Sequence, residues 1–494
     1  MVGPKDRTTE GRIVIIPRLR NAFAELHVSQ RPSRSIDVPL FGSEPEVTLF
    51  QVNEYGARDD DGDVYNFPVI FHRTGELWVE ANSYLLNCIV HRHINSRPTD
   101  DIRRKAGKLL DYLVFCEEQS IDWTDFSGKR PSLRPTYRYY KNLIDRGDRA
   151  SAVINQYTGV VYDFYRFVSQ SFHEIDMSRV DTVKQIKILI DTSRGMRSVE
   201  VDKRSQTQRT GGVSPVPIGF VRDDGEDLRP LSNSQLAELL RIIDGDGWSS
   251  FERLIIKTAL MTGARKQTVL TLRVKHVKSL AKAKVQPDGT CFLQAGPGTG
   301  IDTKFNKPQK LYFPKQLVDD LQILLSSQIA MRRRESFRAR YSKEYSELKP
   351  LVEDDEYVFL SDQGNCYYMA KDDPRYKVVK SPPTGQVSET IRKKLSYYTS
   401  DKFPKAFSYH WLRATFAYQL YQLLKPALES GRLKYGEEIT VIQCRLHHSD
   451  RTTTENYLKL FNMEFVKLEA QEKYEDWLFS FGSYKDLSLE AVIE

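Results

Sequence analysis

The sequence predicts a multidomain protein of the α+β class, mainly helical with small β-sheets. Three observations support this prediction. At 494 residues the chain is too long for one ordinary core. Strand-like runs separated by polar turns fill the chain to about residue 78, and apolar residues then recur at helical spacing. A stretch at 201–228, rich in Gly, Pro, Ser and charge, separates two regions of this helical kind.

The composition is that of a globular protein, with 40% hydrophobic and 28% charged residues. The formal net charge of +7 is modest, and it fits a nucleic-acid binder only if the positive charge is clustered. The five cysteines include no CxxC pair, which is typical of reduced thiols. No apolar run approaches the length of a membrane span, so we expect a soluble, cytoplasmic protein without a membrane partner.

Residues 1–78 are predicted to form a β-rich N-terminal region of unknown role. The runs GRIVIIPRL, EVTLFQV and FPVIFH have the composition of strands, and polar turn residues lie between them.

Residues 79–200 are predicted to form a small helical domain. Its second helix carries Ile102, Leu109 and Leu113 at helical spacing, with arginines and lysines on much of the remaining surface. The next helix carries an apolar stripe that includes Val153 and Phe164. Such basic faces suit contact with DNA, but solvated charge on ordinary amphipathic helices explains any single one equally well.

Residues 201–228 are predicted to be a linker, 229–470 a second domain and 471–494 a C-terminal tail. The second domain begins with a helix that Ser232 or Asn233 can cap. A basic segment at 331–350 interleaves arginines with aromatic residues at four-residue steps. This spacing suits a helix that tracks a phosphate backbone, but it suits an aromatic seam facing the protein's own core somewhat better.

Four residues of the second domain are candidate phosphate ligands. Arg265 follows a Thr-Gly-Ala break between two helices, where backbone N–H groups also favour an anion. Lys304 lies beside a predicted hairpin turn, from which a mobile amine can reach a site. His410 and Arg413 are three apart at the start of a helix and so project from one face. Taken alone, His410 and Arg413 are better explained as a capping and a surface side chain, and Lys304 as a solvated lysine. The motif around Arg265 is weak evidence by itself.

A second histidine and a tyrosine complete the group. His448 precedes Tyr457 by nine positions, and a polar Thr run between them is expected to turn into a short helix that presents the tyrosine.

Taken together, the order of these residues resembles the tyrosine recombinase (phage integrase) family. The family's TGxR box is similar to MTGARKQTVLTLR, its H-x-L-R box to HWLRATFA, and its third box to LHHSDRTTTENY. The resemblance covers about residues 79–470 and implies a helical core-binding domain and a catalytic domain that clamp duplex DNA. Two positions depart from the pattern. Thr268 stands where the family usually has an acidic residue, and His447 where it usually has glycine.

The resemblance implies a site-specific recombinase that cuts and rejoins DNA through a 3′-phosphotyrosyl intermediate. Tyr457 is then the nucleophile, Arg265 and Arg413 hold the phosphate, His410 and His448 assist, and Lys304 is the general acid. The resemblance also implies double-stranded DNA as the partner and a homotetramer on paired DNA sites, with room for accessory proteins. It implies no metal or nucleotide cofactor. Two alternatives remain open: a type IB topoisomerase-like enzyme, and a DNA-binding member that has lost cleavage.

Overall fold

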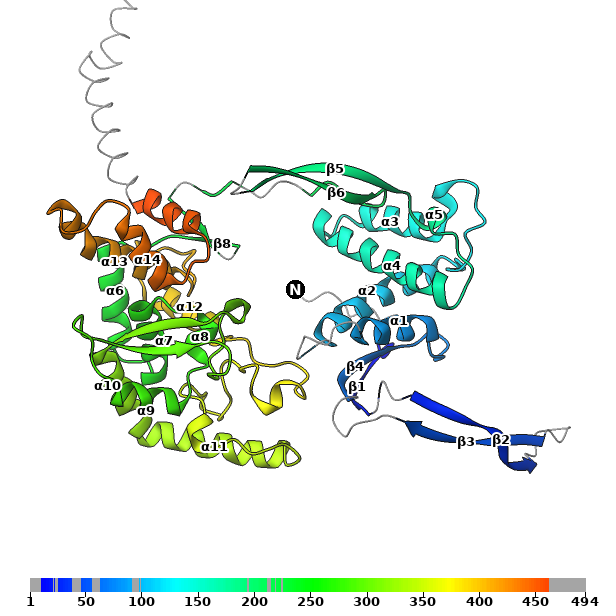
Figure 1. Ribbon diagram of the computed structural model, residues 1–494, viewed down its shortest axis with the longest axis horizontal. Helices are drawn as coiled ribbons and strands as arrows, with labels where there is room; N and C mark the ends of the chain where they lie inside the picture. The colour runs from blue at the N-terminus through cyan, green and yellow to red at the C-terminus, as the bar shows by residue number, and fades with distance from the viewer. Residues whose placement is uncertain are drawn as a thin grey trace, which may run out of the picture. The chain divides into compact units, whose positions relative to one another are not determined.

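The computed structural model describes residues 10–20, 22, 25–37, 46–55, 63–90, 97, 99–192, 195–210, 215–217, 219–223 and 225–461 (Figure 1). The predicted tail at 471–494 lies outside these residues. Helices predominate, and the sheets have two strands each. The predicted fold class, mainly α with small β-sheets, is therefore confirmed. No helix in the described part of the chain has the length and apolar character needed to cross a bilayer.

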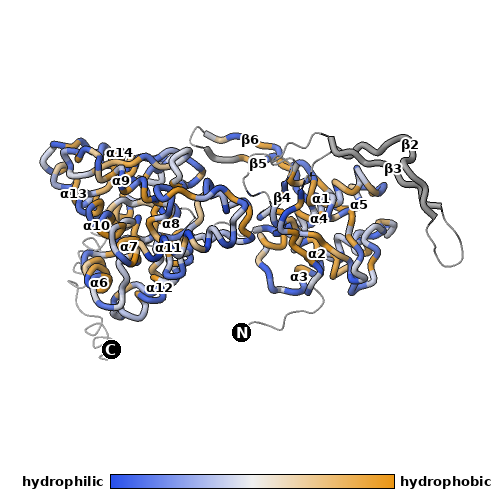
Figure 2. The backbone as a smooth tube through the Cα atoms, turned by 90° about the horizontal axis from the view of Figure 1, so that it is seen from below, coloured by the Kyte–Doolittle hydropathy of each residue, from blue (hydrophilic) through white to orange (hydrophobic). Residues whose placement is uncertain are grey.

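The contacts divide the chain into two compact units, residues 1–214 with 377–380, and residues 215–376 with 381–494. Each unit has its own hydrophobic core, and Figure 2 shows hydrophobic stretches along the helices of both. The boundaries predicted from the sequence at 78, 200 and 228 stay predictions.

The first unit combines antiparallel β-hairpins with a group of helices. Its strands are β1 (Ile13–Leu19), β2 (Glu25–Asp37), β3 (Glu46–Tyr55), β4 (Val64–Ile70), β5 (Val183–Thr192) and β6 (Gly195–Arg204), paired as β1–β4, β2–β3 and β5–β6. Its helices are α1 (Val79–Val90), α2 (Thr99–Glu118), α3 (Pro135–Arg146), α4 (Ser151–Ser171) and α5 (Met177–Val180). The three strand-like runs that the sequence predicts before residue 78 thus coincide with β1, β3 and β4.

Aromatic side chains lie at the centre of the core of the first unit. Trp78 and Phe164 are fully buried, and their rings meet edge to face with centroids 5.1 Å apart. The predicted apolar face of α2 is buried at Ile102, Leu109 and Leu113. On α4 the core face includes Ile154, whereas Val153, which the sequence analysis had placed on it, is 36% exposed. The apolar stripe of a helix is wider than one residue per turn, so spacing alone does not determine whether Val153 or Ile154 is the buried residue at its edge.

The second unit is a helical domain with two short hairpins. Its strands are β7 (Val221–Asp223), β8 (Glu226–Leu228), β9 (Thr290–Ala295) and β10 (Gln309–Pro314), paired as β7–β8 and β9–β10. Its helices are α6 (Asn233–Asp244), α7 (Ser250–Thr262), α8 (Lys266–Leu270), α9 (Val274–Lys282), α10 (Lys315–Ser326), α11 (Gln328–Glu344), α12 (Val387–Tyr398), α13 (Trp411–Glu429) and α14 (Glu437–Leu446). A further helical segment at 451–461 ends the described chain.

Local sequence signals fix where these helices begin. Ser232 caps α6 and Ser249 caps α7, each through a reciprocal capping box with the residue three positions on. Hairpin β7–β8 lies inside the range that the sequence predicts as a linker. Its Val221 and Leu228 are nevertheless 3% and 0% exposed and belong to the core of the second unit.

The basic segment at 331–350 lies largely on α11, and its aromatic residues face inward. Phe337 and Tyr341 are 1% and 4% exposed. Two of the arginines are also buried: the Arg333 guanidinium lies 3.8 Å from the centroid of the Phe251 ring, and Arg334 lies beside the carboxylate of Glu356. The interpretation of this segment as a seam facing its own core is therefore confirmed.

Candidate active site

The break between α7 and α8 brings Arg265 into the site. Gly263 ends α7 with a φ of 66°, and a Cβ placed on it would lie 2.5 Å from the ring of Phe416. Glycine is thus required twice, for its left-handed backbone and for the close approach of α13. Arg265 follows as the N-cap residue of α8, and its side chain is 15% exposed.

Arg413 joins three segments that are far apart in the sequence. It lies in the first turn of α13 and is 2% exposed. Its guanidinium donates to the backbone oxygen of Gly263 at 2.6 Å and to that of Leu446 at the end of α14. The three sequence boxes therefore meet at one guanidinium, which is held in a fixed orientation by two carbonyl groups.

The turn after α14 presents His448. His447 ends α14 with a φ of 54°, the left-handed conformation in which glycine is usual. Its imidazole Nε2 lies 2.9 Å from the backbone oxygen of Lys310 and 3.1 Å from the backbone nitrogen, and this contact anchors the strained residue to β10. The departure from glycine at this position is thus accommodated locally.

Tyr457 lies on the helical segment 451–461, as predicted, but its side chain is buried with 0% exposure. The His448 ring stacks on the Tyr457 ring with centroids 5.4 Å apart. The Nδ1 atom of His448 lies 3.0 Å from the hydroxyl of Thr454, which fixes the ring and leaves Nε2 directed into the site. The tyrosine is therefore presented on a helix but is not exposed to solvent.

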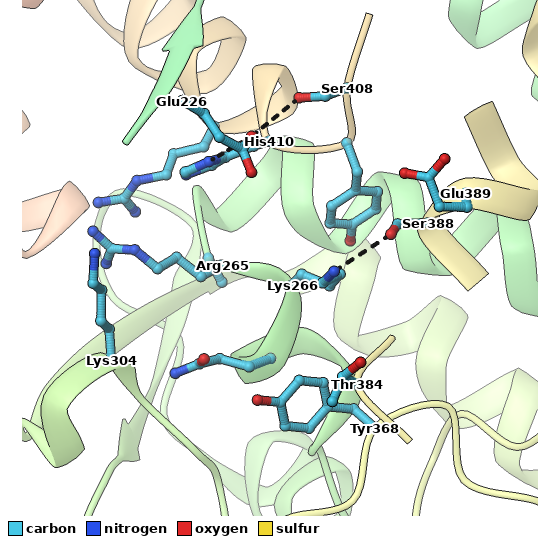
Figure 3. Close-up of a pocket in the computed structure, with 14 residues that line it drawn as sticks. Glu226, Arg265, Lys266, Lys304, Tyr368, Thr384, Ser388, Glu389, Ser408 and His410 are labelled. Atoms are coloured by element: carbon cyan, nitrogen blue, oxygen red, sulfur yellow. Dashed lines mark hydrogen bonds and ion pairs between the residues drawn. The ribbon is translucent and has the colours of Figure 1, made fainter. Parts of the chain in front are cut away.

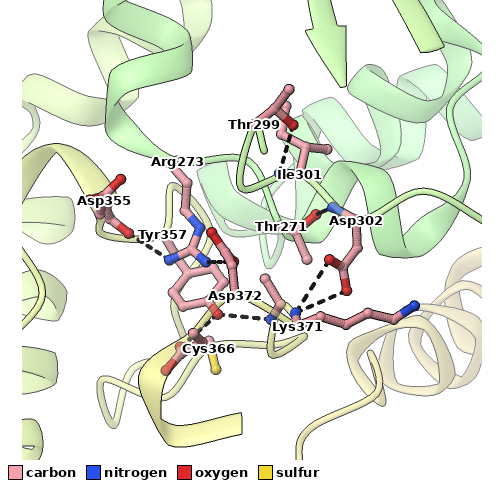
Figure 4. A network of polar contacts seen from close by, with 12 residues as sticks. Thr271, Arg273, Thr299, Ile301, Asp302, Asp355, Tyr357, Cys366, Lys371 and Asp372 are labelled. Carbon is pink, nitrogen blue, oxygen red and sulfur yellow. Dashed lines mark hydrogen bonds and ion pairs between the residues drawn. The ribbon is translucent and has the colours of Figure 1, made fainter. Parts of the chain in front are cut away.

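Lys304 lies in a short 3₁₀ turn between β9 and β10. The chain just before it is pinned to α8, because Thr268 donates to the backbone oxygen of Asp302 at 2.9 Å and the Asp302 N–H donates to Thr271 at 2.9 Å. The Asp302 carboxylate also accepts hydrogen bonds from the backbone N–H of Lys371 (Figure 4). Thr268 thus anchors the segment that carries Lys304 instead of supplying an acidic group.

An acidic residue that the sequence analysis missed lies at the centre of the site. Asp223, at the end of β7, is 6% exposed and accepts a hydrogen bond from the Tyr457 hydroxyl at 3.1 Å. The same carboxylate lies 3.4 Å from Nε of Arg413, 3.5 Å from Nε2 of His448 and 3.9 Å from a guanidinium nitrogen of Arg265. Apolar residues on both sides of an Asp-Asp-Gly turn signalled this hairpin, but the surrounding Gly and Pro favoured a linker.

These contacts set the charges of the buried groups. Burial by itself raises the pKa of the Asp223 carboxyl, but the hydrogen bond with His448 and the charges of Arg413 and Arg265 outweigh it and hold the pKa far below its usual range. Burial and the nearby arginines lower the pKa of His448. Burial, together with the Asp223 charge, raises the pKa of Tyr457 well above its ordinary value. Tyr457 is therefore a neutral phenol and Asp223 a carboxylate at neutral pH.

A cleft of about 500 Å³ opens beside these buried residues. Arg265, Lys304, His410 and Arg413 contribute to its lining, together with Glu226 of β8. Figure 3 shows the side chains of Arg265 and Lys304 side by side, with His410 beside Glu226. Nδ1 of His410 lies 3.4 Å from the Glu226 carboxylate, and its Nε2 is buried without a hydrogen-bond partner among the described residues. The cleft therefore collects basic groups suited to an anionic ligand.

The structure thus groups the six residues selected from the sequence in two sets. Arg413, His448 and Tyr457 surround Asp223 in the buried part of the site, and Arg265 reaches the same carboxylate from the cleft. Lys304 and His410 line the cleft. The catalytic roles that the resemblance implies for them stay predictions.

Solved structures of tyrosine recombinases match most of this chain at low sequence identity. The integrase of the Tn1549 transposon, in complex with transposon right end DNA, matches with 14% identity and a TM-score of 0.38, over 78% of this chain and 98% of that one. The XerH recombinase bound to its difH substrate matches with 14% identity and a TM-score of 0.38, over 76% and 85%. A lambda integrase dimer bound to a COC′ core site matches with 11% identity and a TM-score of 0.38, over 77% and 94%. No protein-family model and no curated protein matches the sequence.

Proposed function

We propose that this protein is a site-specific DNA recombinase that cuts and rejoins strands through Tyr457. The observation that carries the proposal is the convergence of Arg413, Arg265, His448 and the Tyr457 hydroxyl on a single anionic group. Guanidinium groups in this arrangement can hold the non-bridging oxygens of a phosphodiester. The tyrosine hydroxyl then lies beside the phosphorus atom that it would attack.

In the proposed cleavage step, the Tyr457 oxygen forms a bond to phosphorus and the bond from phosphorus to the 5′-oxygen breaks. The proton of the Tyr457 phenol passes to Nε2 of His448, whose lowered pKa keeps the imidazole neutral and able to accept it. Arg265 and Arg413 stabilise the charge of the pentacoordinate phosphorus, and each such preorganised donor is typically worth about a hundred- to a thousandfold in rate. His410 lines the cleft, its buried Nε2 has no hydrogen-bond partner among the described residues, and it supplies another donor. Lys304 protonates the departing 5′-oxygen, which is typically worth about a hundred- to ten-thousandfold.

Rejoining reverses the chemistry. The 5′-hydroxyl of a partner strand attacks the 3′-phosphotyrosyl bond and releases Tyr457, so that the number of phosphodiester bonds is conserved. The partner is double-stranded DNA, and a homotetramer on two paired sites, with accessory proteins, completes the proposed assembly. The protein groups used in these steps are all side chains of this chain.

The test is covalent trapping. The DNA that co-purifies with the full-length protein gives the target site, and a suicide substrate carrying this site should yield a protease-sensitive protein–DNA adduct. Tyr457→Phe should abolish the adduct, whereas Tyr418→Phe, which alters a phenol on α13 packed against Phe461, should retain it. An adduct that persists in Tyr457→Phe would refute the assignment of the nucleophile.

Two further outcomes separate the alternatives. Supercoil relaxation by the wild type without strand exchange between two sites would indicate a topoisomerase-like enzyme. Specific DNA binding with no adduct in the wild type would indicate a member that binds DNA but does not cleave it.

A further inference from the structure

Hairpin β7–β8 places two carboxylates against the basic groups of the candidate site. Asp223, the last residue of β7, contacts Arg413, His448, Arg265 and Tyr457. Glu226, the first residue of β8, lies against His410 and accepts from the Ser408 hydroxyl at 3.5 Å. One short hairpin, with three residues in each strand, thus reaches both the buried part of the site and the cleft.

If the natural ligand of the site is a phosphodiester, Asp223 contacts the same donors that its phosphate would need. A carboxylate oxygen and a non-bridging phosphate oxygen are both anionic acceptors, and they compete for the same donors. The two cannot share the site, because the Asp223 carboxylate would then face the phosphate charge in a buried, weakly screened environment. The Tyr457 hydroxyl also donates to Asp223, so this contact must break before the oxygen can reach phosphorus.

The opposite role for Asp223, as a general base that takes the tyrosine proton, fits the site poorly. An effective base has a pKa near the working pH. The hydrogen bond with His448 and the charges of Arg413 and Arg265 hold the pKa of Asp223 far below that range, against the effect of its burial. The carboxylate is thus a strong ligand for the arginines and a weak acceptor of protons.

The hairpin is small enough to be displaced. It has three residues in each strand, closed at Gly225 with a φ of 83°. Arg222 and Asp227 pair across the strands at 2.7 Å, whereas Val221 and Leu228 anchor the base of the hairpin in the core. Isolated two-stranded hairpins are only marginally stable, and local opening of such small units costs little free energy. The tip with its two carboxylates can therefore leave the site while the anchored ends stay in place.

We propose that hairpin β7–β8 is an internal lock on the cleavage site, in which Asp223 and Glu226 hold the phosphate-binding groups until a DNA phosphate displaces them. This inference rests on the proposed function, because it assumes that the natural ligand of the site is a phosphodiester. It assigns a regulatory role to a segment that lies outside the three motifs. Cleavage then depends on the binding energy of correctly placed DNA.

The first test measures binding of inorganic phosphate by calorimetry with the full-length chain. Asp223→Asn keeps the shape of the side chain and removes its charge. If the open form is populated at roughly 0.1–10%, as is usual for a minor state, unlocking should strengthen phosphate binding by about tenfold or more. Asp227→Asn is the matched control, because it removes a charge from the same hairpin but from the pair with Arg222, and its affinity should stay within about twofold of the wild type.

Equal phosphate affinity in Asp223→Asn and the wild type would overturn the lock. So would an equal gain in Asp227→Asn, since the gain would then reflect net charge alone. Glu226→Gln, which alters a side chain that is 58% exposed, should give a smaller gain in the same direction and does not threaten the fold.

The second test follows the hairpin in the wild type and needs no variant. Hydrogen exchange of the backbone amides at 219–228 should become faster at saturating inorganic phosphate, because the carboxylates lose their partners and the hairpin opens. Exchange that is unchanged or slower with phosphate bound would overturn the lock.

Neither measurement depends on cleavage, so the two proposals can fail separately. Tighter phosphate binding and faster exchange without any DNA adduct would support the lock and count against the recombinase. An adduct in the wild type with no change in either measurement would support the recombinase and overturn the lock.

Discussion

The buried part of the candidate site and the cleft beside it hold similar side chains in different environments. In the buried part, Arg413 and Tyr457 are 2% and 0% exposed, and Arg413 is fixed by two backbone carbonyls and a carboxylate. In the cleft, the side chains of Arg265 and His410 are 15% and 17% exposed. The difference in burial indicates that the buried groups stabilise the fold through many contacts, whereas the cleft groups contact one carboxylate each among the ion pairs given above and contribute less to stability.

The largest effect on stability is expected at Arg413. Arg413→Ala leaves Asp223 buried without its nearest guanidinium and frees the Gly263 and Leu446 carbonyls, so the free energy of unfolding should fall by about 3–5 kcal/mol. Arg265→Ala, which removes a partly exposed guanidinium 3.9 Å from the same carboxylate, should cost no more than about 1 kcal/mol. Urea unfolding of both variants measures the difference. Equal losses in the free energy of unfolding would contradict the view that the buried part of the site contributes more to stability than the cleft.

A pH-dependent effect is expected at His447, at the edge of the buried part. Burial lowers the pKa of this imidazole to about 4, below the ordinary 6.5. The unfolded chain therefore binds the proton first as the pH falls, so the contribution to stability is complete above pH 6.5 and is lost toward pH 4. It amounts to up to about 3 kcal/mol.

His447→Asn should flatten this dependence, because asparagine tolerates the left-handed backbone and does not titrate. Urea unfolding of the wild type and the variant at a series of pH values gives the comparison. Parallel stability curves between pH 7 and 4 would show that His447 is not the responsible group.

A smaller effect is expected at Thr268. Thr268→Val keeps the shape of the side chain but removes the hydrogen bond to the Asp302 carbonyl, which should cost about 1 kcal/mol in the free energy of unfolding. Because this bond anchors the segment before Lys304, the rate of adduct formation should fall as well. The matched control is Thr399→Val, which also removes a hydrogen bond from a threonine hydroxyl to a backbone carbonyl, that of Leu395, but at the end of α12 and outside the cleft lining. A normal rate of adduct formation together with lowered stability would show that the Thr268 hydrogen bond stabilises the fold without affecting cleavage.

The smallest effect on stability is expected at Lys304. Its side chain lies at the cleft, in a turn, so Lys304→Ala should change the free energy of unfolding by less than about 0.5 kcal/mol. Adduct formation should nevertheless slow by about a hundred- to ten-thousandfold if Lys304 protonates the leaving oxygen. A substrate with a 5′-sulfur leaving group, which needs no proton, should restore the rate. Failure of this rescue would assign Lys304 to binding.

The sequence predicted the structure correctly where the signal involves residues close together in the chain. Ser232, one of the two caps that the sequence allowed, caps its helix, Tyr457 lies on a helix, and the aromatic residues of α11 face the core. Capping and periodicity involve residues within a few positions of each other, so the sequence records them. The sequence reading placed Val153 on the wrong face, because spacing alone does not fix which edge of a wide stripe is buried.

The sequence by itself determined the fold class and a set of six residues whose order resembles one family. Only the tertiary structure decided how these residues are held. Arg413 is oriented by carbonyls 150 and 33 positions away, and Asp223 reaches Tyr457 across 234 positions. No pattern of composition or spacing records such contacts, since they arise when α7, α13 and α14 pack around a common core. The acidic group at the centre of the site therefore remained within a stretch that the sequence predicted as a linker.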